Sequence, residues 1–117
     1  MSSFEIMIWR FKYSNPREIK AYEIIISFTI PDVDKKNESI IMQCAYEAAY
    51  VASGTIRDNV NYCANINESC MTNIENATAL ASKKANKTYH DCLRQFGMYE
   101  EMIRACEVSV FVRESII

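Results

Sequence analysis

The chain has 117 residues, of which 50% are hydrophobic and 24% charged, with two glycines and two prolines, so we expect one folded domain over residues 1–117. Its formal net charge of −2 argues against a protein dedicated to duplex nucleic acid, because such proteins carry a clear basic excess. No apolar run reaches membrane-spanning length, and the first residues lack the basic start and apolar stretch of a secretory signal, so we expect a cytoplasmic protein without membrane contact.

The first two expected elements are antiparallel strands joined by a turn at residues 14–17, where Pro16 favours turn geometry. Alternation predicts a strand over 4–13 with two faces. One face carries Phe4, Ile6, Ile8, Arg10 and Lys12, and the other carries Met7, Trp9, Phe11 and Tyr13. The second strand covers 18–30, and its inward set is Tyr22, Ile24, Ile26, Phe28 and Ile30. Because both of its faces hold apolar residues, we expect helices or another subunit to cover both sides of the sheet, at least in part.

The next expected element is a helix over residues 38–53, with Asn37 or a neighbour as its N-cap and Gly54 as its end. Its polar face carries Tyr46 and Tyr50 one turn apart. Tyrosine offers a large contact area with a polar tip, so this face is typical of a contact surface. Residues 55–67 are expected to be helical or irregular.

An apolar stripe in the second half predicts a long helix over residues 68–96. The stripe consists of Cys70, Ile74, Ala77, Ala81, Ala85, Thr88, Cys92 and Phe96. Such a helix is ~43 Å long, whereas a domain of this size has a radius of gyration of ~13 Å, so we expect it to overhang a monomeric core. The small residues at the centre of the stripe favour close approach of another backbone. We therefore expect a homo-oligomer, a dimer or a larger assembly.

A short amphipathic turn over residues 98–104 then leads into a last strand over 105–115. The element order β-β-α-α-β predicts an α+β fold of two layers: a β-hairpin, two helices of which the second is long, and a C-terminal strand.

The chemistry-bearing residues do not form a catalytic set. His90 is the sole histidine, the glycines do not form a phosphate-binding loop, and no cysteine pair has metal-ligand spacing, so we expect no enzyme activity, no cofactor and no metal. The five cysteines are expected to be buried free thiols rather than disulfides or nucleophiles. Four Asn-x-Ser/Thr motifs are attributed to an AT-rich coding sequence, as in a low-GC bacterium or its phages, and not to glycosylation.

The remaining candidates suit an anionic, aromatic ligand held without catalysis. Arginine binds phosphate groups in bidentate fashion, and aromatic rings stack on nucleobases. The candidate ligand-binding residues are Tyr50, Arg57, Asn61, Phe111 and Arg113. The two arginines also have a simpler interpretation as ordinary ion-pair partners.

In size, in its hairpin followed by two helices and in its lack of catalytic residues, the chain resembles the first type of phage anti-Thoeris sponge. The resemblance implies a non-catalytic protein that sequesters cyclic ADP-ribose isomers, the immune signals made by bacterial TIR-domain enzymes. It implies action in the host bacterial cytosol, ligand sites between the subunits of an oligomer as large as a hexamer, and further sites for cyclic oligonucleotides.

Two other functions stay open. The first is a protein-interaction adaptor or inhibitor that acts through the long helix and the face with Tyr46 and Tyr50. The second is a small enzyme on an unfamiliar scaffold.

Overall fold

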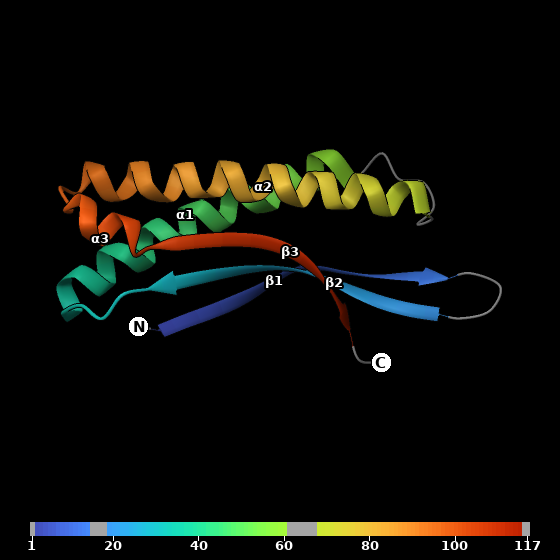
Figure 1. Ribbon diagram of the computed structural model, residues 1–117, viewed down its shortest axis with the longest axis horizontal. Coiled ribbons are helices and arrows are strands. Elements are labelled where there is room, and N and C mark those ends of the chain that lie inside the picture. The colour runs from blue at the N-terminus through green and yellow to red at the C-terminus, as the bar shows by residue number, and fades with distance from the viewer. Residues whose placement is uncertain (1, 15–18, 61–67, 116–117) are drawn as a thin grey trace.

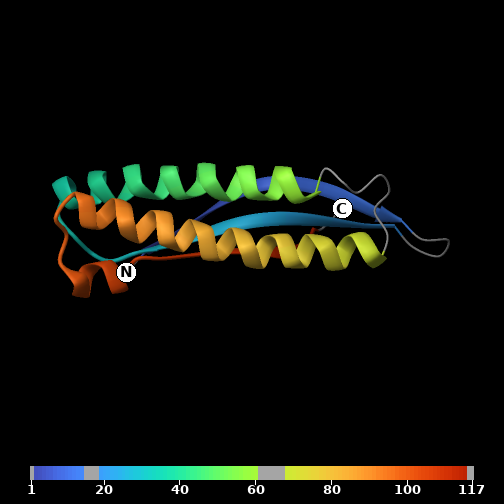
Figure 2. The same ribbon diagram turned by 90° about the horizontal axis from the view of Figure 1, so that it is seen from above.

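Two layers make up the fold, a three-stranded antiparallel sheet and a pair of long helices on one of its faces (Figures 1 and 2). The computed structural model describes residues 2–14, 19–60 and 68–115. Its elements are β1 (Ser2–Ser14), β2 (Ile19–Ile30), α1 (Lys35–Val60), α2 (Glu68–Gln95), α3 (Glu100–Arg104) and β3 (Glu107–Ser115). The strand order is β1-β2-β3. The α+β class and the order of elements are therefore confirmed, and the turn around Pro16 lies outside the described residues.

The two layers have matched lengths, which corrects the expectation that the long helix overhangs its core. α2 has 28 residues and α1 has 26, which correspond to ~42 and ~39 Å of helix. β1 and β2 have 13 and 12 residues, or ~43 and ~40 Å of extended chain. The predicted stripe of α2 is buried inside its own chain at Ile74, Ala77, Ala81, Ala85 and Cys92. Its small residues allow close packing within the domain, so the stripe by itself is no sign of assembly.

The helix-facing side of the sheet holds the core, and the predicted inward set of β2 is confirmed. Ile24, Ile26 and Phe28 are fully buried against the helices, together with Val108 and Val110 of β3. Both long helices lie on this one face (Figure 1), so helices of the same chain cover the sheet on one side and not on both.

α1 is longer than expected at both ends. Asp34 caps its N-terminus, because its side-chain Oδ1 accepts a hydrogen bond of 2.8 Å from the backbone N–H of Asn37. At the other end the helix continues past Gly54 to Val60, where burial of Ile56 and Val60 outweighs the low helix propensity of glycine. Gly97 does end α2. It has a φ of 77°, and Met98 donates its N–H to the carbonyl of Leu93, as in a Schellman cap.

A β-bulge in β1 changes which of its side chains face the helices. Met7 pairs with Ile25 and Trp9 pairs with Ile24, so Ile8 is an extra residue in β1. Strict alternation from Phe4 would place Trp9 on the outer face. With the bulge, Ile8 and Trp9 both face α1 and Phe11 joins the core, while Arg10 turns to the outer face. The predicted faces of this strand are therefore correct up to Ile8 and reversed beyond it.

Two of the cysteines form a disulfide, which corrects the expectation of free thiols. Cys44 of α1 and Cys92 of α2 are bonded, with their Cα atoms 5.6 Å apart and a separation of 48 positions in sequence. Both fall on buried helical stripes, and packing those stripes together brings the sulfur atoms into contact. Cys106 is free and buried, as expected. Cys63 and the side chain of Cys70 lie outside the described residues.

Side chains of α2 close the N-terminal part of the outer edge of β3. Ser82 Oγ accepts a hydrogen bond from Val110 N–H and donates one to its carbonyl, and Asn86 makes the equivalent two bonds with Val108. One turn further on, His90 Nε2 donates to the carbonyl of Cys106 over 2.7 Å. Four residues of helix advance ~6 Å and two residues of strand ~6.6 Å, so three successive turns stay in register with the strand. These bonds satisfy the edge backbone groups that a sheet otherwise exposes.

Candidate functional site

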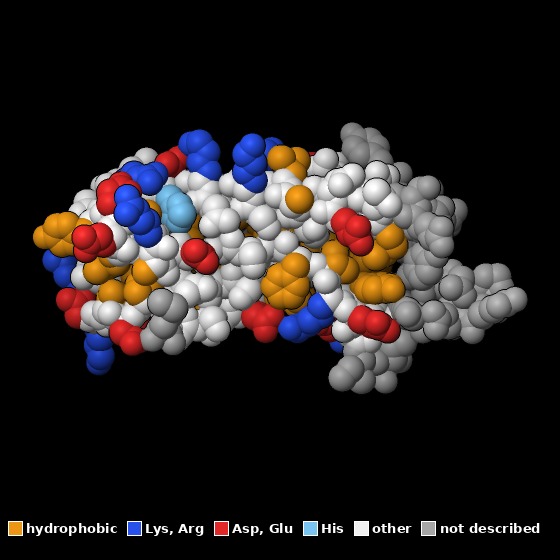
Figure 3. All heavy atoms as spheres, viewed as in Figure 1, with side chains coloured by type: hydrophobic (Ala, Val, Ile, Leu, Met, Phe, Trp, Pro, Cys, Tyr) orange, Lys and Arg blue, Asp and Glu red, His pale blue; other side chains and the backbone are white. Residues whose placement is uncertain are grey.

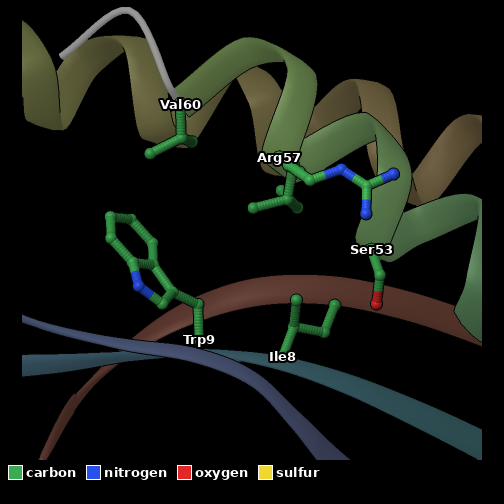
Figure 4. Close-up of a pocket in the computed structure, with 6 residues that line it drawn as sticks. Ile8, Trp9, Ser53, Arg57 and Val60 are labelled. Atoms are coloured by element: carbon green, nitrogen blue, oxygen red, sulfur yellow. The ribbon is translucent and has the colours of Figure 1, made fainter.

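A pocket opens between β1 and the C-terminal half of α1 (Figure 4). Its volume is about 290 Å³. The lining comes from the two elements in turn: Ile8 and Trp9 from β1, and Ser53, Ile56, Arg57 and Val60 from α1. The pocket exists because of the two departures from the expected fold, since the bulge turns Trp9 toward α1 and the extension of α1 past Gly54 supplies Arg57 and Val60.

The pocket has an aromatic end and a polar end. The indole of Trp9 lies near Val60 at one end, and the side chains of Arg57 and Ser53 lie at the other (Figure 4). Ser53 and Arg57 are one helical turn apart on α1, so their polar groups point to the same side. Ile8 and Ile56 complete the lining of the pocket.

Arg57 has no ion-pair partner among the described residues. Its side chain is exposed in the last turn of α1 and bends back along the helix, so that a side-chain carbon at Gly54 would come within 3.7 Å of Nη2. A guanidinium at a helix C-terminus interacts favourably with the helix dipole, which accounts for its presence without a ligand. A guanidinium has five N–H donors, and none of those of Arg57 bonds to another described residue, so they could bind an anion at the mouth of the pocket.

Three of the other predicted site residues, Tyr50, Phe111 and Arg113, do not line this pocket. Tyr50 is 79% exposed on the side of α1 that faces away from the sheet. Phe111 and Arg113 lie on the outer face of the sheet, opposite Ile25 and Glu23 of β2. Asn61 lies outside the described residues. Of the four predicted positions that the structure describes, Arg57 is thus the one that lines this pocket. Trp9 is the aromatic lining residue that the sequence analysis did not choose as a candidate.

Arg113 belongs to a charge network that runs across the outer face of the sheet. Its guanidinium pairs with Glu5 at 2.9 Å and with Glu23 at 3.3 Å, and Arg10 pairs with Glu23 at 2.8 Å. The hydrogen bonds from Arg10, Ser115 and Arg113 lower the pKa of the Glu23 carboxyl. These pairs link all three strands, so the ion-pair interpretation of Arg113 fits its surroundings within the chain.

A second hollow lies along the outer side of the helix pair. It has a volume of about 530 Å³ and is lined by Gln43, Tyr46, Glu47, Tyr50, Val51 and Thr88. Tyr46 is 60% exposed, so the tyrosine face that the sequence predicted is present and open on this side. We call this hollow the tyrosine groove.

The buried titratable groups near the core are structural. Burial raises the pKa of the Tyr89 hydroxyl and of the Cys106 thiol, so both stay protonated at neutral pH. A protonated buried thiol is a poor nucleophile. In the space-filling view, basic side chains gather over the helices and hydrophobic atoms reach the surface in separate places, not as one patch (Figure 3).

No family model, curated protein or solved structure matches this chain. Within the parts of the chain that the structure describes, neither long helix carries an apolar stretch sufficient to cross a bilayer. The functional assignment therefore depends on the geometry of the pocket and the groove.

Proposed function

We propose that this protein is a non-catalytic binder that sequesters a cyclic nucleotide signal of the cyclic ADP-ribose type, with the pocket at Trp9 and Arg57 as its site. The observation that supports this most is that an indole and a guanidinium, which has no ion-pair partner among the described residues, lie at the two ends of one cavity. An indole stacks on a nucleobase and a guanidinium binds a phosphate, so the two ends of the pocket match the two parts of a nucleotide. This function would block TIR-based anti-phage defence.

The size of the pocket sets how much of the ligand it holds. Ligand pockets usually measure about 300–1,000 Å³, and this one lies at the lower limit, enough for one nucleoside phosphate. The lining supplies stacking surface, one cation and one hydroxyl, and these groups favour binding over turnover. A sponge needs tight, preorganised binding and no complementarity to a transition state.

The compartment we propose is the bacterial cytosol. Asn86 belongs to an Asn-x-Thr motif, and its carboxamide is occupied by the two hydrogen bonds to Val108. A glycan on Asn86 would remove those bonds, so the fold suits a compartment without N-glycosylation. The Cys44–Cys92 bond is more typical of oxidising compartments, which makes thiol labelling of protein taken directly from bacterial cytosol a direct test.

The chain's single tryptophan lies in the pocket, so its fluorescence reports on the site. Cyclic ADP-ribose isomers and cyclic di- and trinucleotides would be titrated against the protein, with thermal shift as a second measurement. We expect one ligand class to quench Trp9 emission and to raise the melting temperature by several degrees. Mass analysis should recover that ligand intact, whereas a cleaved product would show an enzyme.

Arg57→Ala tests the assignment of the site. It should weaken binding about tenfold to a hundredfold, because a charge-assisted hydrogen bond contributes about 1.5–3 kcal/mol. Arg104→Ala, which removes an exposed arginine from α3, is the matched control and should bind as the wild type does. Equal affinity of all three proteins would contradict the site.

The tyrosine groove supports a second candidate function, an adaptor or inhibitor that binds another protein. The groove is largely apolar, Glu47 is among its lining residues, and exposed tyrosines are common at the centre of protein interfaces. If no nucleotide changes the fluorescence or the melting temperature, this candidate replaces the first.

A further inference from the structure

The tyrosine groove is built almost entirely by one face of α1. The two long helices lie side by side (Figure 2) and are joined by a disulfide, so the groove depends on ordered helices and not on a loop. Its volume of about 530 Å³ falls within the range of small-molecule sites. Thr88 lines it from α2, and the lining residues from α1 are spaced mainly by three and four positions: Gln43, Tyr46, Glu47, Tyr50 and Val51.

Both tyrosine rings of the groove are exposed, and neither stacks on another aromatic ring of the described residues. Phe4 and Phe28 of the sheet, by contrast, stack on each other with their ring centroids 4.9 Å apart. The face of an aromatic ring carries partial negative charge and attracts a cation that lies within about 6 Å of the ring centroid. Tyr46 and Tyr50, one helical turn apart, thus offer two such faces on the same side of α1.

A carboxylate lies beside these rings. Glu47 is three positions before Tyr50, so the two side chains are neighbours on the helix surface. Glu47 is exposed and has no ion-pair partner among the described residues, whereas Asp91 pairs with Lys87 at 2.6 Å. The residues that line the groove include no lysine, arginine or histidine. The groove therefore combines aromatic faces with a negative charge that no lining residue neutralises.

We propose that the tyrosine groove binds a small alkylated ammonium cation. The faces of Tyr46 and Tyr50 contact its N-alkyl groups, and Glu47 supplies the opposite charge. Aromatic rings grouped around a quaternary ammonium are an established mode of recognition for such cations. The single carboxylate matches a cation of one charge. This inference rests on the groove alone and does not depend on the nucleotide pocket.

The largely apolar lining favours an alkylated ammonium over a primary one. A primary ammonium is compact and strongly hydrated, and moving it against the tyrosine rings and Val51 removes water from its three N–H donors. A quaternary ammonium has no N–H donor, and its alkyl groups gain free energy when apolar carbon replaces water around them. The affinity should therefore rise with the number of N-methyl groups.

The test is an NMR titration of the full chain with methylated ammonium chlorides at constant ionic strength. We expect tetramethylammonium to shift the backbone amide signals of residues 46–51 and of Thr88. The dissociation constant should be in the millimolar range, because single cation–π contacts at exposed sites are weak. Methylammonium should bind about tenfold more weakly, and sodium chloride should leave these signals unchanged.

Substitutions separate the contribution of the charge from that of the ring. Glu47→Gln removes the charge and Tyr50→Leu removes one ring, and each should weaken tetramethylammonium binding about threefold to tenfold. Tyr50→Phe keeps the ring and should bind as the wild type does. Glu38→Gln makes the same change as Glu47→Gln in the first turn of α1, outside the groove, and is the matched control. All three positions are exposed, so circular dichroism should show an unchanged fold.

Several outcomes would overturn the proposal. These are an absence of amide shifts, tighter binding of methylammonium than of tetramethylammonium, and unchanged binding by folded Glu47→Gln and Tyr50→Leu. A trimethyllysine peptide that binds far more tightly than tetramethylammonium would also overturn it, because the occupant would then be a partner protein and not a small molecule. The nucleotide titration follows Trp9 at a different site, so its result leaves this test unaffected.

Discussion

β1 and β3 form the two edges of the sheet, and among the described residues helix side chains bond to the edge backbone of β3, over its N-terminal part, and not to that of β1. β3 lies beside α2, whose polar side chains at positions 82, 86 and 90 bond to the backbone of Val110, Val108 and, just before the strand, Cys106. β1 lies below α1, which instead presents Ser53, Arg57 and two apolar side chains to a pocket. In both places a helix lies along an edge strand. Where the spacing of the helix's polar residues matches that of the strand's backbone groups, the helix bonds to the edge. Where it does not match, a cavity is left.

The largest expected effect on stability comes from reducing the disulfide that joins α2 to α1. The Cys44–Cys92 bond closes a loop of 48 residues, and the chain-entropy relation assigns about 4 kcal/mol of stabilisation to such a loop. Urea unfolding with and without reductant measures this difference. If the bond holds the sealed edge in place, hydrogen exchange of Val108 and Val110 should accelerate on reduction more than that of the β1 amides. Equal unfolding midpoints in the two conditions would contradict the role of the bond.

A smaller loss of stability is expected when the hydrogen bonds between Asn86 and the edge of β3 are removed. Asn86→Ala leaves the N–H and C=O of Val108 without their partners, at a cost of about 3 kcal/mol for two buried backbone groups. Asn76→Ala makes the same change on the exposed side of α2 and should alter stability by less than about 0.5 kcal/mol. Chemical denaturation of the two variants gives the comparison, and similar losses in both would show that Asn86 does not seal the edge.

The smallest expected effect is the pH dependence of the network that connects the two edges. The pKa of Glu23 is lowered from 4.5 by Arg10, Ser115 and Arg113, which come from β1 and β3. A carboxyl whose pKa is lower in the folded state contributes stability above its unfolded pKa and loses it as the pH falls through the folded value. Thermal melting below pH 4.5 should therefore show a smaller acid-induced drop for Glu23→Gln than for the wild type. An identical pH profile for the two proteins would show that Glu23 does not contribute to the pH dependence of stability.

Much of the fold could be predicted from local patterns. The strands, the long helix, its end at Gly97 and the inward set of β2 all follow from periodicity and capping residues. The extension of α1 past Gly54 could not be predicted in this way, because burial of Ile56 and Val60 against the sheet overrides the local preference of glycine.

The candidate site could be predicted from the sequence only in part. Arg57 could be selected as a cation near an aromatic face, but the side chain that completes the pocket is Trp9. Alternation alone assigns Trp9 to the other face, and no local signal in residues 4–13 marks the bulge that turns it. The side-chain types of Phe111 and Arg113 suit the same kind of ligand as Arg57. The sheet nevertheless holds both residues on its outer face, away from the pocket.

The sequence by itself determined the elements, their order and the buried faces of β2 and of the long helices, because these depend on the spacing of apolar residues and on a few capping positions. Only the tertiary structure decided that Cys44 meets Cys92, that α2 seals the edge at β3, and that Trp9 and Arg57 share a cavity. Each of these is a contact between elements far apart in the chain. Such contacts depend on the register between a helix and a strand or between two helices, and no local repeat specifies that register.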